Sequence, residues 1–449
     1  MCRKFIRRFW IIFLTLSLGL SACTSTPASP ELPATVCPTD ASTLVPPALP
    51  TRPDPTPTLP AETLQLGSSL FIQQETDLTV VFFLQNIDPK LTYFNIEYTV
   101  YAFDGAGATI GTDSGPIDFI APGENFGAAS LIFLDYGDVV EKVDVEWTCS
   151  AVEGSPYRSP FSVTKTRFID DLYFDVFTGL IANEGTVSFT DLRVNAIGLD
   201  AYGRLVGGGI GNVSMLPGKE RVGVNVYGTV TEEPAQVLFY PTRSFLTASF
   251  EDGDWRNNLK IQDYGFVQDS LQVGGGFLVQ NITDKVIKDS QYLVTVYEAD
   301  GTVSNIAYGK IDILFPGETL GVSPGAIPLF TGAMPSKVDV TVLPGEFTEH
   351  PLAKSPLVAE STEFEIVDLF PRVTVMIKNT LNSRITDLFL YVLLYNEKDE
   401  IVGGGTAFPE NIEPGGSVGV YVPVNYVGTT APARIEAYPV ITEWSEILP

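Results

Sequence analysis

The chain has 449 residues, of which 45% are apolar and 18% are charged. This length allows two to four domains with real hydrophobic cores. It holds 54 acidic against 27 basic residues, a net charge of −27, so its surface repels nucleic acid and anionic membranes, and the sequence argues against nucleic-acid partners.

The N-terminus has the pattern of an export signal. A basic start, M-C-R-K-F-I-R-R, precedes the 12-residue apolar run Phe9–Leu20. This run is too short to span a membrane as a helix and is typical of a signal peptide. We therefore predict that residues 1–22 are removed from the mature protein.

The end of this signal, L-S-A-C at positions 20 to 23, resembles the lipobox of bacterial lipoproteins. The resemblance implies cleavage between Ala22 and Cys23 and a covalent lipid on the Cys23 thiol, which would anchor the protein at the bacterial cell membrane or outer surface. Thr24 is not Asp, so the lipoprotein resemblance gives no argument for retention at an inner membrane. An ordinary export signal followed by a chance cysteine is the alternative.

Residues 23–62 are predicted to form a tether. The stretch from Thr24 to Glu62 holds 11 Pro among 39 residues and almost no periodic apolar pattern. Such a segment favours extended polyproline II at roughly 3.1 Å per residue, so its full reach approaches about 120 Å. Cys37 in this tether and Cys149 at the end of a strand-like run are a possible disulfide in an exported protein, and a free Cys37 is the alternative.

The remainder of the chain is a fourfold repeat with three landmarks. Matching asparagines stand 97, 98 and 98 residues apart, an acidic or amide residue follows each after 17 or 18 residues, and a Pro-Gly step follows after 17 or 18 more. The landmarks are Asn86, Asn183, Asn281 and Asn379; Asp104, Asp200, Glu298 and Asn396; and Pro122-Gly123, Pro217-Gly218, Pro316-Gly317 and Pro414-Gly415. The Pro-Gly chemistry predicts a type II turn, with positive φ at Gly, that separates two strands.

The pattern inside each copy is β. Apolar and polar residues alternate over 94–100, which predicts a half-buried strand, and the apolar run Leu388–Tyr395 predicts a central one. About seven short strands per copy predict an all-β fold of four tandem immunoglobulin-like antiparallel sandwiches. Their predicted bounds are 63–155 (segment A), 156–254 (B), 255–351 (A′) and 352–449 (B′).

Alternate copies resemble each other most. Segments A and A′ share Q-N-I-x-x-K and K-V-D-V, whereas B and B′ share V-G-G-G and V-G-V-x-V. We infer that a two-segment unit was duplicated, and that A packs on B in a way that was copied whole. The V-G-G-G runs lack the Lys-Ser/Thr of a phosphate loop, so they predict a β-bulge or a close approach of two backbones.

One stretch resembles a known family. V-T-V-Y-E-A-D-G-T-V (294 to 303), preceded by Asn281 and followed by P-G-E, is similar to the FxLYD-type domain of bacterial surface lipoproteins. V-Y-A-F-D, A-I-G-L-D and V-L-L-Y-N occupy the same place in the other copies. The resemblance implies an immunoglobulin-like fold and an envelope setting, and it implies no catalytic residue.

Few residues are available for catalysis. His350 is the one histidine and lies in a Pro-flanked linker, which excludes histidine-based triads and multi-histidine metal sites. It is predicted to be exposed. Asp170 and Asp171, with Asp175 nearby, are the best carboxylate group, but neighbours on a strand point to opposite faces, so a catalytic pair is not expected there.

Two binding sites remain open. Asp252, Asp254 and Asn257 at the B to A′ junction form a weak calcium candidate, against which a polar linker is the alternative. Outward-facing aromatics such as Tyr202, Tyr308 and Tyr426 would suit a glycan platform, although strand aromatics more often belong to the core.

The sequence therefore favours a non-enzymatic, lipid-anchored envelope protein whose repeats serve as a stalk or a protein-interaction module. A solute- or glycan-binding lipoprotein is the first alternative, and a hydrolase with a carboxylate pair is the second. The expected partners are the membrane, through the lipid, and an envelope protein or glycan; the sequence predicts no oligomeric state.

Overall fold

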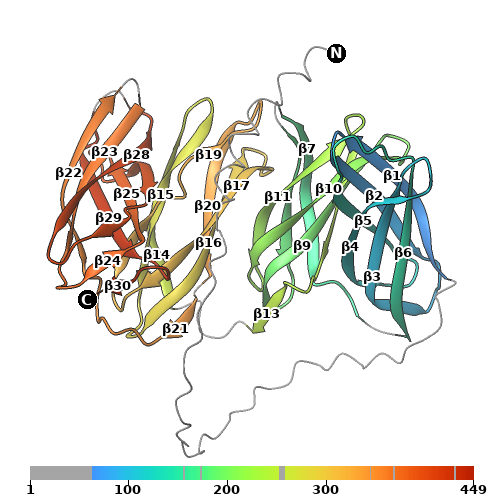
Figure 1. Cartoon of the computed structure of the whole chain (residues 1–449), viewed down its shortest axis with the longest axis horizontal. Helices are drawn as coiled ribbons and strands as arrows, with labels where there is room; N and C mark the ends of the chain where they lie inside the picture. Colours follow the sequence, from blue (N-terminus) through green and yellow to red (C-terminus); the bar gives the residue numbers. More distant parts are fainter. Residues whose placement is uncertain are drawn as a thin grey trace, which may run out of the picture. The chain divides into compact units, whose positions relative to one another are not determined.

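The computed structural model describes residues 63–154, 157–171, 174–251, 258–343, 345–367, 370–428 and 431–448, which form strands and loops without a helix (Figure 1). These residues belong to one compact unit. Every strand pairing among them is antiparallel, so the predicted all-β fold is confirmed. The signal peptide, Cys23 and the tether lie outside the described residues.

Segment A consists of two three-stranded sheets. The first has the order β1 (Leu64–Gln74), β2 (Asp77–Asn86), β5 (Asn125–Phe133), and the second β4 (Thr109–Ile120), β3 (Leu91–Phe103), β6 (Lys142–Glu153). Ile96, Tyr98 and Val100 alternate with more exposed residues along β3 and are at most 1% exposed, as the pattern predicts. The Tyr98 ring meets Phe82 of the other sheet edge-on at 5.1 Å, which places the core between the sheets.

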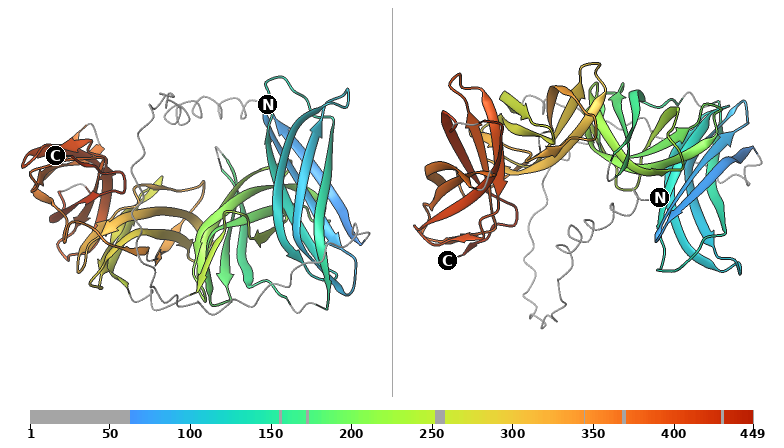
Figure 2. Two further views of the ribbon diagram at one scale, coloured as in Figure 1. Left: turned by 60° about the horizontal axis from the view of Figure 1, so that its bottom comes forward. Right: turned by 90° about the horizontal axis from the view of Figure 1, so that it is seen from above.

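Segment B forms a single seven-stranded sheet, which curls (green in Figure 2). Its order is β12 (Gln236–Thr242), β9 (Val187–Leu199), β10 (Leu205–Leu216), β11 (Arg221–Val230), β8 (Asp175–Asn183), β7 (Phe161–Asp170), and β13 (Ala248–Glu251) also pairs with β9. The run 207–209 joins the two halves, because it pairs with β9 on one side and with 228–230 of β11 on the other.

The glycines of this run allow that double pairing. A Cβ on Gly208 would lie 2.3 Å from the carbonyl oxygen of Ala196, and one on Gly209 would lie 2.2 Å from that of Tyr227. The ladder also shifts register between Leu205 and Gly207. The prediction of a bulge and a close backbone approach at V-G-G-G is confirmed.

Segments A′ and B′ repeat these arrangements. The sheets of A′ have the order β14 (Leu259–Gln268), β15 (Gln272–Asn281), β18 (Thr319–Val322), with β19 (Ile327–Pro328) on β15, and β17 (Val303–Leu314), β16 (Val286–Glu298), β20 (Pro335–Leu343), with β21 (Glu346–Thr348) on β16. The six-stranded sheet of B′ has the order β22 (Leu357–Val367), β23 (Phe370–Asn379), β28 (Ser417–Tyr426), β26 (Ile401–Ala407), β25 (Leu388–Tyr395), β29 (Arg434–Ile441). A small sheet adds β27 (Asn411–Ile412), β24 (Arg384–Thr386) and β30 (Ile447–Leu448).

The landmark asparagines are buried braces. Each is at most 1% exposed, and its side-chain amide donates to carbonyls of the loop that follows and of the strand end near the Pro-Gly turn. Its side-chain oxygen accepts the N–H of the residue two positions on. One side chain bonds both to the loop that follows it and to a later strand end. Its distance along the sequence from these two partners is therefore nearly the same in every copy.

The other two landmarks shape turns. The Asp104, Asp200 and Asn396 side chains accept two backbone N–H bonds from their own loops, which caps the strand end. Gly123, Gly317 and Gly415 have φ of 74°, 71° and 62°, as a type II turn requires. In segment B the turn is displaced by one residue, because Lys219, with φ of 61°, takes the positive-φ position that was predicted for Gly218.

Candidate binding groove

A groove of about 770 Å³ lies where segment A meets segment B. Its walls are the facing edge strands β7 and β12 of the curled sheet, together with the end of β4 and the start of β5 in segment A. The curl of segment B creates it, since β7 and β12 each pair with only one neighbour in the sheet.

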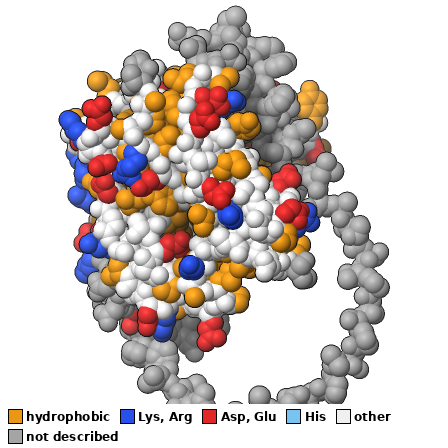
Figure 3. Space-filling model, turned by 90° about the vertical axis from the view of Figure 1, so that its left-hand side faces the viewer, with side chains coloured by type: hydrophobic (Ala, Val, Ile, Leu, Met, Phe, Trp, Pro, Cys, Tyr) orange, Lys and Arg blue, Asp and Glu red, His pale blue; other side chains and the backbone are white. Residues whose placement is uncertain are grey.

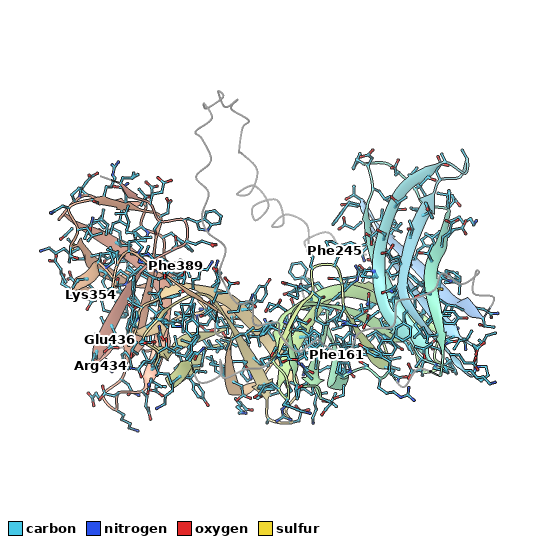
Figure 4. All side chains as sticks on the ribbon, turned by 90° about the horizontal axis from the view of Figure 1, so that it is seen from below. Phe161, Phe245, Lys354, Phe389, Arg434 and Glu436 are labelled. Atoms are coloured by element: carbon cyan, nitrogen blue, oxygen red, sulfur yellow. The ribbon has the colours of Figure 1, made fainter. Side chains whose placement is uncertain are left out.

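Aromatic side chains line much of this groove. Phe119, Phe126, Tyr157, Phe161 and Tyr240 are all partly buried, so their rings cover the wall while part of each stays accessible. They are held by edge-on or tilted ring contacts, among them Phe119 with Tyr157 at 4.7 Å and Phe126 with Tyr240 at 5.2 Å. Figure 4 shows the place of Phe161 on its strand. Such rings suit an apolar or sugar face.

One ion pair fixes the two walls to each other. The Arg243 guanidinium donates from Nε and Nη2 to the two carboxylate oxygens of Asp118, both at 2.9 Å, and Nη2 also donates to the Tyr157 hydroxyl at 3.0 Å. Burial opposes the charge of Arg243, but Asp118 and Tyr157 outweigh it and raise the pKa of the guanidinium. This bidentate pair holds the segment A wall of the groove in a fixed position relative to the segment B wall.

The predicted carboxylate group does not form a catalytic pair. Asp171 is 8% exposed and accepts the N–H and hydroxyl of Thr331 in segment A′, both at 2.8 Å, whereas Asp170 is exposed. Asp175 accepts the N–H of Val230 at 3.2 Å. Asp171 therefore joins two segments.

His350 corrects a prediction. It lies in the loop between β21 and β22, as expected, but it is half-buried rather than exposed. Its Nδ1 accepts the N–H of Leu352 at 3.1 Å, and its ring meets Phe315 edge-on at 5.3 Å. These two contacts hold the His350 ring against the protein, which the Pro-flanked sequence around it did not indicate.

The predicted aromatic platform is not assembled from the residues proposed for it. Tyr202 is 86% exposed in the β9 to β10 turn, and Tyr308 is 67% exposed on β17. Tyr426 is half-buried and packs on Phe364. The aromatic groove between segments A and B was missed; the only sequence signal was the Tyr-Pro pair at 240–241, where a repeat closes.

The metal and thiol predictions have different outcomes. Asp252, Asp254 and Asn257 lie outside the described residues, and so does Cys37. Cys149, on β6, is half-buried and has no cysteine partner among the described residues, and burial raises the pKa of its thiol. Pairing of Cys37 with Cys149 stays a prediction.

Among the described residues, one cluster of three acids has metal-like spacing: Asp289, Asp312 and Glu443. The Lys310 ammonium already lies among them, 2.6 Å from Asp289, 3.3 Å from Asp312 and 2.7 Å from Glu443. Burial opposes its charge, but these hydrogen bonds and charges outweigh that and raise the pKa of Lys310. The cluster is an ion-pair network between A′ and B′.

No family model matches the chain, and no curated protein matches it. Within the part of the chain that the structure describes, there is no helix of the length and hydrophobicity needed to span a membrane.

Proposed function

We propose that the chain is a non-enzymatic, lipid-anchored protein of the bacterial cell envelope, and that its four β-sandwich repeats form a stalk or protein-interaction module. The lipobox-like L-S-A-C and the Pro-rich tether support the anchor. The observation that carries the proposal is that each segment packs directly on the next through built interfaces, as a stalk or a presenting array requires.

The A to B contact recurs between A′ and B′. In the first, β2 and β5 pack on β10 and β9; in the second, the equivalent β15 and β18 pack on β26 and β25. A Cβ on Gly127 would lie 2.6 Å from the Tyr240 ring, and one on Gly321 would lie 2.3 Å from the Tyr438 ring. The same glycine and tyrosine meet in both contacts, which supports duplication of an A–B unit.

Segment B is joined to A′ by a second kind of contact. Arg167 of B donates to Glu298 of A′ at 2.8 Å, and Asn225 of B donates to Asn305 of A′. Gly223 lies against Thr295, its N–H donating to the Thr295 hydroxyl at 3.2 Å. Buried polar bonds of this kind require one relative placement of the two surfaces, which supports a stalk rather than a flexible string.

The test of the anchor is Cys23→Ser in the full chain, expressed in a bacterium. We expect the wild-type protein to partition with the membrane and into detergent, and Cys23→Ser to be released or mislocalised. Inhibition of the lipoprotein signal peptidase with globomycin should leave the wild-type precursor uncut. Unchanged membrane attachment of Cys23→Ser would refute the anchor.

Binding of a solute or glycan is the second candidate function, and the aromatic groove between A and B favours it. Its ring-lined wall and ordered Asp118–Arg243 pair are suited to a ligand with an apolar face and hydroxyl groups. We expect Phe161→Ala to abolish oligosaccharide binding by the full chain on a glycan array, with Tyr202→Ala as the exposed control. No binding by the wild-type chain would remove this candidate.

A further inference from the structure

Each segment type uses two faces, and two of these faces, one on A and one on B′, are not covered by any other described residue. An A-type segment presents the sheet of β1, β2 and β5, or its equivalent, to the B-type segment that follows. It presents the other sheet to the B-type segment that precedes: β16 and β17 of A′ lie on β8, β10 and β11 of B. In the described part of the chain nothing precedes A on its β3–β4 face, and nothing follows B′ on its β22–β23–β28 face.

The uncovered face of B′ has the same register as the face of B that binds A′. In B, Gly223 pairs with Leu180 and Asn225 pairs with Thr178. In B′, Gly419 pairs with Met376 and Tyr421 pairs with Thr374, so each position is displaced by 196 residues. The glycine and the threonine recur in B′, whereas methionine replaces the leucine and tyrosine replaces the asparagine. The two faces therefore present similar backbones.

The difference between the two faces is their exposure. Thr178 is fully buried and Leu180 is 6% exposed beneath A′, whereas Thr374 and Met376 are half-exposed. Tyr421 is 64% exposed and the nearby Phe370 is 75% exposed. Figure 3 views the molecule from the side on which β22, β23 and β28 lie in Figure 1, and shows hydrophobic side chains exposed on this face among charged ones. Large exposed apolar groups in one place mark an interaction site.

Gly419 indicates how close a partner comes. A Cβ on Gly223 would lie 2.5 Å from the Thr295 methyl group and 2.9 Å from the Ile306 side chain, so glycine is needed there for A′ to dock. A Cβ on Gly419 would have one heavy atom in range, the Met376 sulfur, at 3.2 Å. The exposed glycine leaves room for the same flush approach of another sheet.

The uncovered face of segment A is the counterpart. Strand registers place Tyr101 where A′ has Thr295, Thr112 where it has Ile306, and Phe103 where it has Tyr297. The Tyr101 and Phe103 rings stack at 6.4 Å and both are partly exposed. The β3–β4 face of segment A thus has aromatic side chains at the positions by which the equivalent face of A′ contacts segment B.

We propose that the β3–β4 face of segment A in one copy of the chain docks on the β22–β23–β28 face of segment B′ in a second copy, in the manner of the internal B to A′ contact. The two faces are different surfaces, so the contact is heterologous, and a copy that has used one face still offers the other. Association continues from copy to copy in a head-to-tail row.

This contact is weaker than the internal B to A′ contact. The Arg167–Glu298 ion pair of B and A′ has no equivalent, because Glu363 and Asp104 stand at the matching positions. Two acids placed opposite each other oppose docking, so the row forms only at high local concentration. Glu363→Arg replaces the repulsion by an attraction and should strengthen the contact.

Disulfide trapping tests the geometry in the purified full-length chain, with all four native cysteines, Cys2, Cys23, Cys37 and Cys149, replaced by alanine. Gly419→Cys and Tyr101→Cys mimic the internal neighbours Gly223 and Thr295, which are in direct contact: the Gly223 N–H donates to the Thr295 hydroxyl at 3.2 Å. Both substitutions in one chain should give a ladder of covalent multimers on oxidation. Two differently tagged chains, each with one of them, should give a mixed dimer and nothing larger.

The controls separate the alternatives. Tyr202→Cys, exposed and on neither face, should give no specific adduct, and unchanged circular dichroism melting confirms that each variant folds. Glu363→Arg should raise the ladder yield severalfold, whereas Glu397→Arg in an exposed loop should not. A dimer from Gly419→Cys alone would show a symmetric B′ to B′ contact and overturn the proposal, and so would adducts no more abundant than those of Tyr202→Cys.

Discussion

Replacement of Asn86 by alanine is the sharpest test of the repeat architecture. The Asn86 side-chain amide donates to the carbonyls of Leu91, Ile120 and Ala121 at 2.7, 3.2 and 2.9 Å, and its oxygen accepts the Asp88 N–H at 3.0 Å. All of this lies at a fully buried position. The amide has only two N–H groups, so the three carbonyl contacts count as about two hydrogen bonds, and the Asp88 N–H adds a third; at about 1 kcal/mol per bond, the loss is about 3 kcal/mol for segment A.

Hydrogen exchange of the full chain, followed peptide by peptide, measures this loss where it occurs. About 3 kcal/mol corresponds to exchange about a hundredfold faster in segment A, with little change in A′ and B′. Asn212→Ala is the matched control, because the Asn212 amide is exposed and makes one long bond of 3.4 Å to Asp191. If Asn86→Ala and Asn212→Ala exchanged alike, the buried brace would not hold the repeat together.

Three further outcomes are expected. Gly208→Ala forces a Cβ to 2.3 Å from the Ala196 carbonyl and should lower the melting temperature by several degrees, whereas Gly105→Ala, whose nearest atom is 3.5 Å away, should not. Burial raises the pKa of Glu318 above its ordinary 4.5, so segment A′ should lose stability as pH rises from about 4.5 through the folded-state pKa. Hydrogen exchange measured against pH should show this loss in the wild-type chain and not in Glu318→Gln. The same loss in Glu318→Gln would contradict the assignment to Glu318. Burial also raises the pKa of Cys149, so at pH 8 its alkylation, followed by mass spectrometry, should be much slower in the folded chain than in urea; equal rates would contradict this.

Local chemistry made much of the fold predictable. The Pro-Gly turns, the Asx-type caps and the glycine run depend on backbone conformations or steric limits that few residues satisfy, so their positions were readable from the sequence. The displaced turn at Lys219 shows the limit, since Lys tolerates the positive φ that glycine was expected to take. His350 is half-buried because its ring packs on Phe315. Phe315 is distant in sequence, so the residues around His350 could not predict this contact.

The candidate groove was less predictable because it arises from tertiary curvature. Nothing in β7 or β12 alone indicates that the two strands face each other; this follows from the pairing of 207–209 with β11, which turns two sheets into one. The aromatic residues on these strands have ordinary strand patterns. Their assembly into one wall is a consequence of the curl and of Arg243 binding Asp118 across the junction.

Gly223 and Gly419 occupy equivalent strand positions, one in the internal B to A′ contact and one on the exposed face of B′. Glycine at 223 is required because the A′ sheet lies flush against it, with the Thr295 methyl 2.5 Å from the position of a Cβ. At 419 the described residues impose no such requirement, since a side chain there meets only the end of the flexible Met376. A strand-interior glycine weakens a sheet and offers no contact surface. Its presence on an exposed face, beside Tyr421, is therefore explained when another sheet approaches that face as A′ approaches B.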